Sequence, residues 1–205
     1  MRTASHAIAG ATVNDAILCV LAGALRRWIT DHHGHLGVVR VRVPVSLHHE
    51  GDEAANRDSF FSLGLPLSEP DPVVRLRLVH RRTTVRKSAH DAERMDALMH
   101  ELSGVSPRLQ QFCVRVQESP REFALCVSNV PGPRVPVRVL GAPVRTIHSL
   151  AEIGQRHALR VSAVSLAGSL CFGFCADPSL IEDVQGMADS VVAEARTLID
   201  TVQAV

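Results

Sequence analysis

The segment Ser128-Asn129-Val130-Pro131-Gly132-Pro133 places a hydroxyl and an amide side chain next to a turn of restricted geometry. The two prolines fix φ on either side of Gly132, and such a turn can present Asn129 and bare backbone N–H groups to a ligand. The alternative is structural, because the segment follows an expected strand at residues 123–127 and Ser128 and Asn129 can satisfy backbone groups where that strand ends. The residue types favour the structural alternative and leave the binding role open.

A second pair of polar residues, Asn14-Asp15, stands directly before a long apolar stretch. In the first turn of a helix, an amide side chain can position a polar group of a substrate near the positive end of the helix dipole. A carboxylate at the same place can instead cap the helix and compensate its dipole. Both interpretations apply to Asn14 and Asp15, and capping is the more common role.

Other chemical signatures are missing from the sequence. It has no GxSxG elbow of a serine hydrolase, no GxxxxGK[ST] or GxGxxG phosphate loop, and no His and Cys spacing typical of zinc. We therefore expect neither a metal site nor a bound cofactor.

A run of basic residues occupies residues 75–87 without an acidic residue between them. Such a helix can contact the phosphates of a ligand or the surface of a membrane or lipid body. The more frequent explanation is the solvated face of a surface helix. The run consists of Arg75, Arg77, His80, Arg81, Arg82, Arg86 and Lys87.

Composition limits the classes of partner. The 205 residues are 46% hydrophobic, enough for a core of their own, and 22 basic against 21 acidic residues leave a formal charge of +1. That charge, with 3% aromatic residues and no tyrosine, argues against nucleic acid as a partner. Five cysteines stand singly in apolar runs and no run is long enough to span a membrane, so we expect reduced thiols and a cytoplasmic location.

The elements that must position these residues are helices and strands in mixed order. Residues 13–28 repeat apolar positions with the period of a helix that buries one face, with Thr12 as N-cap. Asp71-Pro72 and Ser106-Pro107 each open a further helix, and residues 184–202 form the last one. Because the strands lack regular βαβ alternation, we expect an α+β fold with a mixed sheet flanked by helices, in one structural unit. The expected strands are residues 39–43, 60–67, 123–127, 135–140, 159–165 and 170–175.

Several of these segments, in the same order, resemble the wax ester synthase/diacylglycerol acyltransferase family. Residues 12–27 resemble its "tvNDvvLavvaGaLRryL" segment, residues 43–47 its "vPVSlR" strand and residues 71–76 its "dpveRL". Asn56 with residues 63–67 resembles "GN…l.lPl", here without the glycine. Residues 128–133 read as the family's SNVPGP, and residues 140–142 continue with its "laGa" turn.

This resemblance implies one half of a chloramphenicol-acetyltransferase-like fold, with residues 1–205 as the C-terminal domain of a two-half protein and a substrate tunnel between the halves. It further implies acyl transfer from acyl-CoA to a fatty alcohol or diacylglycerol. The residues that it implies as substrate-binding are Asn14, Asp15, Ser128, Asn129, Pro131 and Gly132. Around Asn14 and residues 128–133 we accordingly expect an apolar surface that the other half, or a second copy, would cover.

The family's general base is a histidine of an HHxxxDG motif in the N-terminal half, and the 205 residues contain no such motif. His48 and Asp52 satisfy HxxxD, but Glu53 replaces the glycine, and we interpret this site as a solvated loop. We therefore expect no catalytic residue within the chain and no activity without an HHxxxDG-bearing half. The alternative is a non-catalytic remnant or regulatory domain that binds a partner protein or lipid through the former inter-domain face.

Overall fold

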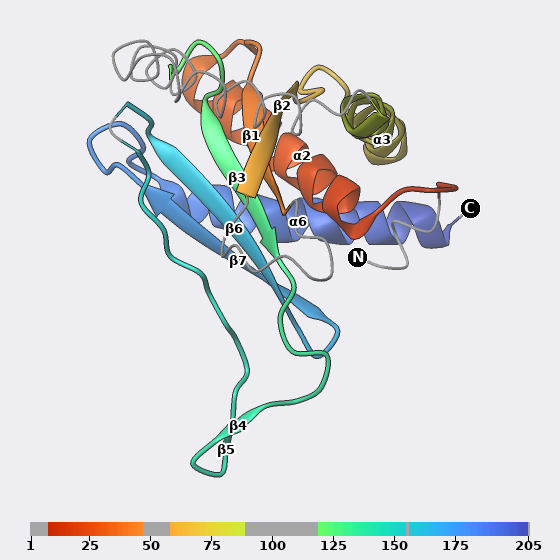
Figure 1. The fold of residues 1–205 in the computed structure, drawn as a ribbon. Helices are drawn as coiled ribbons and strands as arrows, with labels where there is room; N and C mark the ends of the chain where they lie inside the picture. Colours follow the sequence, from red (N-terminus) through yellow and green to blue (C-terminus); the bar gives the residue numbers. More distant parts are fainter. Residues whose placement is uncertain (1–7, 47–57, 89–118, 155, 205) are drawn as a thin grey trace, which may run out of the picture.

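The computed structural model describes residues 8–46, 58–88, 119–154 and 156–204. Among these residues, three long helices and a five-stranded sheet make up the body (Figure 1). In chain order the elements are α2 (Val13–His33), β1 (Arg40–Ser46), β2 (Asp58–Gly64), α3 (Pro72–Ser88), β3 (Leu125–Val130), β4 (Arg138–Val139), β5 (Ala142–Pro143), β6 (Leu159–Leu166), β7 (Ser169–Ala176) and α6 (Val184–Gln203).

The sheet has the order β2-β1-β3-β6-β7. Its three central strands β1, β3 and β6 are parallel, whereas β2 and β7 pair antiparallel with the strands beside them at the two edges. The expected mixed sheet flanked by helices is therefore confirmed. Because the central strands are parallel, the C-terminal ends of β1, β3 and β6 lie at the same end of the sheet. The SNVPGP segment lies at this end.

Helix α2 begins where the sequence predicts. Thr12 and Asp15 form a reciprocal capping box, and Gly34 ends the helix in the left-handed conformation with φ of 70°. The prediction that α2 buries one face is wrong, because every residue from 15 to 25 is buried. Helices α3 and α6 pack against α2, and Figure 1 shows α2 and α6 beside the sheet, so residues 15–25 of this helix are enclosed on all sides.

Alternation along the strands separates the two faces of the sheet. Val41, Leu125, Val127 and Val161 point to the side of the helices and belong to the same buried cluster as α2. Their neighbours along the strands lie on the opposite face, where Cys126 is partly buried and Ser162 is buried.

The strand expected at residues 135–140 is largely wrong. Only Arg138–Val139 forms a strand, and it pairs with Ala142–Pro143 rather than with the sheet. Pro136 and Pro143 lack N–H donors, and Leu140 and Gly141 turn the chain at φ of 49° and 84°, so this segment folds back on itself as a short hairpin. The hairpin lies at the end of an arm, residues 134–151, which extends from the body (Figure 1).

Several other predictions concern residues that the structure does not describe. The helix that Ser106-Pro107 would open, and the residues His48, Asp52, Glu53 and Asn56, all lie outside the described residues. Strand β3 begins and ends later than expected, so that Ser128 and Asn129 belong to the strand itself.

Candidate functional site

The SNVPGP segment extends the pairing of β3 with β6 beyond the end of β3. Ser128 lies opposite Ser162 and Asn129 opposite Ala163 in the parallel ladder. Past the strand, the Gly132 N–H donates to Ser165 Oγ over 2.9 Å, and the Ala167 N–H donates to the Pro133 carbonyl over 2.8 Å. The turn is thus fixed to β6 on both sides of its glycine.

Gly132 is required by this close approach. A Cβ atom there would overlap the Ser165 carbonyl oxygen and lie 3.3 Å from Val164 Cγ1. Any side chain at position 132 would force the turn away from β6. The structural role that the sequence left open is therefore present, and Ser165, which the sequence did not single out, is the residue that anchors the turn.

The two polar residues at the end of β3 leave opposite faces of the sheet, because successive strand side chains alternate. Asn129 shares the side of Val127, toward the helices, whereas Ser128 shares the side of Cys126. Figure 1 shows that α2 begins at the end of the sheet where β3 ends. Asn14, the second residue of α2, and Asn129 are both partly exposed and belong to this same end of the molecule.

Asp15 lies deeper than its neighbour and is occupied by internal contacts. Its side chain is 1% exposed. One carboxylate oxygen accepts hydrogen bonds from the Thr12 N–H at 2.8 Å and the Thr12 hydroxyl at 3.0 Å, and faces His80 Nδ1 at 3.1 Å. The other accepts from the Thr83 hydroxyl at 2.6 Å. These contacts support the capping interpretation and tie the first turn of α2 to α3.

The same contacts set the acidity of Asp15. Burial alone would raise the pKa of this carboxyl, but hydrogen bonds from Thr83, Thr12 and His80 hold its pKa below the usual value of 3.8. The carboxylate therefore stabilises the fold above its unfolded pKa, and this stabilisation is lost as the pH falls through the lower folded pKa.

Replacing Asp15 with Asn is expected to lower the free energy of unfolding by about 1–3 kcal/mol at neutral pH, since the charged acceptor is lost. The difference between the two proteins should shrink on acidification to about pH 3, because the wild-type carboxylate then loses its advantage. Urea denaturation at both pH values measures this. Asp200→Asn, at an exposed carboxylate on α6, should change little at either pH, and an equal deficit for Asp15→Asn at both pH values would contradict the assignment.

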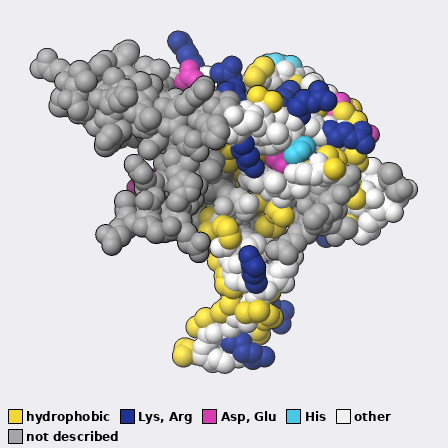
Figure 2. Space-filling view, turned by 45° about the vertical axis from the view of Figure 1, so that its right-hand side comes forward, with side chains coloured by type: hydrophobic (Ala, Val, Ile, Leu, Met, Phe, Trp, Pro, Cys, Tyr) yellow, Lys and Arg dark blue, Asp and Glu magenta, His cyan; other side chains and the backbone are white. Residues whose placement is uncertain are grey.

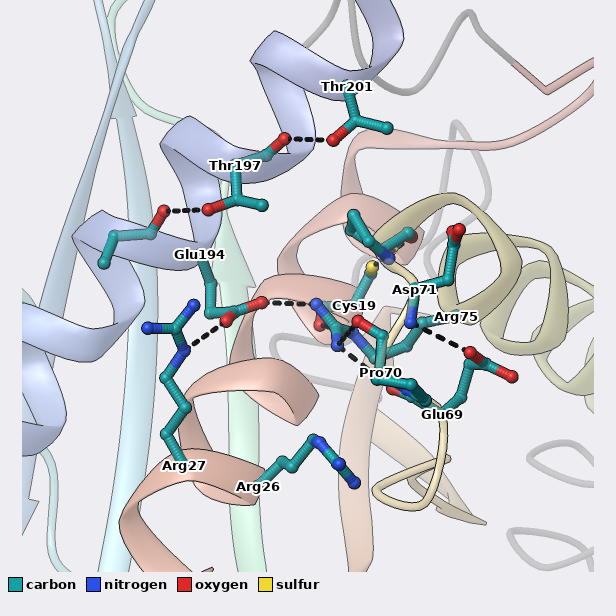
Figure 3. A network of polar contacts seen from close by, with 12 residues as sticks. Cys19, Arg26, Arg27, Glu69, Pro70, Asp71, Arg75, Glu194, Thr197 and Thr201 are labelled. Atoms are coloured by element: carbon teal, nitrogen blue, oxygen red, sulfur yellow. Dashed lines mark hydrogen bonds and ion pairs between the residues drawn. The ribbon is translucent and has the colours of Figure 1, made fainter.

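An ionic network that is buried except for Arg27 joins helices α2, α3 and α6 (Figure 3). Arg75 of α3 is 1% exposed, and its guanidinium pairs with Glu194 of α6. It also donates to the carbonyl oxygens of Cys19 at 3.1 Å and Glu69 at 3.1 Å. Glu194 in turn accepts from Arg27 Nε of α2 over 2.6 Å.

This network corrects the expectation for the basic run of residues 75–87. Arg75 and His80 point into the protein, so they belong neither to a solvated face nor to a lipid-binding face. The spacing contained a signal for Arg75, which precedes the buried Val79 by one helical turn, although its charge suggested exposure.

The remaining reactive groups in the described residues suggest no other centre. Burial raises the pKa of the Cys19 thiol to about 11, despite the neighbouring Arg75. In the part of the chain that the structure describes, the cysteines are free thiols and no three potential metal ligands gather. Nor does any helix of the described ranges have the length and apolar character to cross a membrane.

Comparison with solved structures first identifies the fold. A wax ester synthase/diacylglycerol acyltransferase from Marinobacter aquaeolei VT8 matches 98% of the chain with a TM-score of 0.73 and 22% identity. The epimerization domain of tyrocidine synthetase B and the first condensation domain of the CDA synthetase match with TM-scores of 0.58 and 0.55, at 13% and 18% identity, over 100% and 97% of the chain. All three share the CoA-dependent acyltransferase-like fold, and the chain covers 46%, 45% and 42% of them.

The sequence then identifies the family. The chain belongs to the WS/DGAT C-terminal domain family, whose model matches residues 54–198. Rv1760 of Mycobacterium tuberculosis, named as a diacylglycerol O-acyltransferase, is 29% identical over 93% of the chain, and the O-acyltransferase WSD of Acinetobacter baylyi is 25% identical over 86%. The chain spans only 39% of the length of each of these two relatives.

Proposed function

We propose that this chain forms the C-terminal half of an acyl-CoA-dependent O-acyltransferase that makes triacylglycerol or wax esters together with an HHxxxDG-bearing half. The observation that carries the proposal is the SNVPGP turn, which Gly132 and Ser165 hold against β6 at the end of the molecule where α2 begins. A turn fixed in this way holds Asn129 in a constant position relative to β6. Such rigidity suits one wall of a substrate tunnel.

In the proposed reaction, the histidine of the other half takes the proton from the acceptor hydroxyl, whose oxygen attacks the thioester carbonyl of acyl-CoA. The carbon–sulfur bond breaks, coenzyme A leaves as its thiol, and the acceptor becomes an ester. Acyl-CoA and a fatty alcohol or diacylglycerol are the substrates, and the proposal includes no bound cofactor.

This half would orient the substrates. Asn14 and Asn129 can donate amide hydrogen bonds to polar groups of a substrate, and Pro131 and Gly132 fix the turn beside them. Asp15 acts indirectly by holding the first turn of α2 through Thr12 and Thr83. Ser128 faces the other side of the sheet, and the substrate contact predicted for it stays a prediction.

The arm that follows the SNVPGP turn is the proposed contact with the other half. We expected an exposed apolar surface around Asn14 and residues 128–133. Exposed large apolar side chains lie along the arm instead, and the apolar residues of α2 from 16 to 25 are buried. No acidic residue occurs from 131 to 151, and Figure 2 shows hydrophobic side chains alternating with Lys and Arg on the part that extends from the body. Its exposed large hydrophobic residues are Val135 (67%), Val139 (59%), Leu140 (103%) and Leu150 (77%).

A partner protein is the natural occupant of such a surface, because covering several exposed apolar side chains on one arm removes their area from water. The relatives are more than twice as long as this chain. We therefore propose that the partner is an HHxxxDG-bearing half from the same family.

The double variant Val139→Asp/Leu140→Asp should bind an HHxxxDG-bearing half from a full-length family member at least about 30-fold more weakly than the unmodified chain, as expected when central apolar anchors are lost. Titration of one purified half into the other by calorimetry measures this. Leu180→Asp, at a residue that is 64% exposed on the loop before α6, is the matched control and should bind normally.

Equal binding by the arm variant and the unmodified chain would contradict the role of the arm. A stable monomeric chain that ignores the added half would contradict the two-half assignment. Tight binding without any transferase activity would favour the non-catalytic alternative, a regulatory domain that uses the same face.

A further inference from the structure

Within the described residues, the buried contacts that fix helix α3 to the body lie along one side. Leu76, Val79 and Thr83 are buried on that side, and Arg75 is paired with Glu194. The Thr83 hydroxyl bonds to Asp15 at 2.6 Å. These contacts hold the helix so that its opposite side faces outward in a defined orientation.

The outward side combines an apolar stripe with cationic flanks. Val74, Leu78 and Val85 follow one another at intervals of four and seven residues, which places them on one face of a helix. Val85 is 59% exposed, whereas Val74 and Leu78 are partly buried. Arg77 and Arg81 lie exposed beside this stripe.

The other flank and the charge balance complete this surface. Arg82 borders the stripe on the far flank and donates to the Gly64 carbonyl over 2.5 Å. Helix α3 contains no acidic residue. The nearby carboxylates of Glu69 and Asp71 precede the helix, and they accept hydrogen bonds from backbone N–H groups at its start. Lys and Arg side chains are spread over the upper part of the body in Figure 2.

This arrangement distinguishes among the partners of a basic helix. A merely solvated helix needs no apolar stripe on its outer side, and a single phosphate group would need cations that converge on one point. From Val74 to Val85 the surface instead extends along a helix for about 16 Å, at about 1.5 Å per residue. Apolar residues flanked by cations along such a face are typical of helices that lie in a membrane interface.

We propose that the outer face of α3, formed by Val74, Arg77, Leu78, Arg81 and Val85, docks onto a phospholipid surface that carries anionic headgroups. The arginines attract the headgroups, and the apolar stripe enters the boundary between headgroups and acyl chains. This proposal concerns a different surface from the arm and the SNVPGP turn, and it does not require transferase activity.

The test is cosedimentation of the full 205-residue chain with vesicles of phosphatidylcholine containing phosphatidylglycerol. Arg77→Glu/Arg81→Glu should weaken binding at least about tenfold, since two attractions become repulsions. Val85→Asp should weaken binding to the same vesicles without changing any arginine. The matched control Arg121→Glu/Arg156→Glu makes the same charge change at exposed residues before β3 and β6, and should bind within about twofold of the unmodified chain.

Vesicles of phosphatidylcholine alone should bind weakly, and circular dichroism should show that every variant is folded. Equal binding by the unmodified chain and Arg77→Glu/Arg81→Glu would overturn the proposal, as would an equal loss in the control. Failure to bind vesicles, together with coenzyme A binding that Arg77→Glu/Arg81→Glu abolishes, would assign the face to a soluble phosphate ligand and overturn it as well. None of these outcomes depends on whether the two halves form an active enzyme.

Discussion

Replacing Glu194 with Met is expected to lower the free energy of unfolding by about 3–5 kcal/mol, because Arg75 would then be a buried cation without its counterion. Arg75 is 1% exposed and Glu194 is 5% exposed, so water reaches neither group freely. A loss of this size is a large fraction of the total stability of an ordinary domain. Urea denaturation followed by circular dichroism measures the change.

The double variant Arg75→Met/Glu194→Met separates the unpaired charge from the loss of the pair itself. It should recover much of the stability, since buried ion pairs are often replaced by apolar side chains at little cost. Glu182→Met, at an exposed carboxylate on the loop before α6, should stay within about 0.5 kcal/mol of the unmodified chain. A loss below about 1 kcal/mol for Glu194→Met would mean that water or another group compensates Arg75.

The sequence predicted the elements with strong local signals. Thr12 and Asp15 predicted the start of α2, and Asp71-Pro72 predicted the start of α3. Alternating residues predicted β1, and short runs rich in Val and Leu predicted β6 and β7. Colinear motifs predicted the family and thereby the fold, which composition and periodicity narrowed only to a mixed α+β arrangement.

Tertiary contacts decided what the sequence could not. Nothing local indicates that the sheet, α3 and α6 enclose α2, or that Glu194 meets Arg75 across 119 residues of sequence. The residues 135–140 have strand-like composition, but whether a strand joins the sheet depends on a free edge beside it. Ser165 gave no signal at all, because its role depends on how closely Gly132 approaches β6.

The placement of the candidate residues was predicted in part. Residues 128–133 come at the end of a central strand, as the apolar run before them predicts, and Asn14 begins a helix at the same end of the molecule. The strand geometry nevertheless sends Ser128 and Asn129 to opposite faces, a distinction that follows from the register of β3 and not from the motif.

Acyl transfer is expected only when this chain is combined with an HHxxxDG-bearing half. The general base would come from that half, and such a base contributes about 10² to 10⁴-fold to the rate. In the combined protein, Asn129→Ala should lower kcat/KM about tenfold while leaving unfolding nearly unchanged, since one hydrogen bond to a substrate is lost from a partly exposed position. Val130→Ala, at the exposed neighbour that ends β3, is the matched control and should keep both properties.

The most direct test of the two-half assignment is the formation of ester from radiolabelled acyl-CoA with diacylglycerol or a fatty alcohol, measured for each half alone and for the two together. We predict product only from the mixture. Its rate of formation should fall at least about 100-fold when the HHxxxDG histidine that acts as general base in the added half is replaced with alanine. Turnover by this chain alone that His48→Ala abolishes would contradict the account, because the base would then lie in the HxxxD segment that we interpret as a solvated loop.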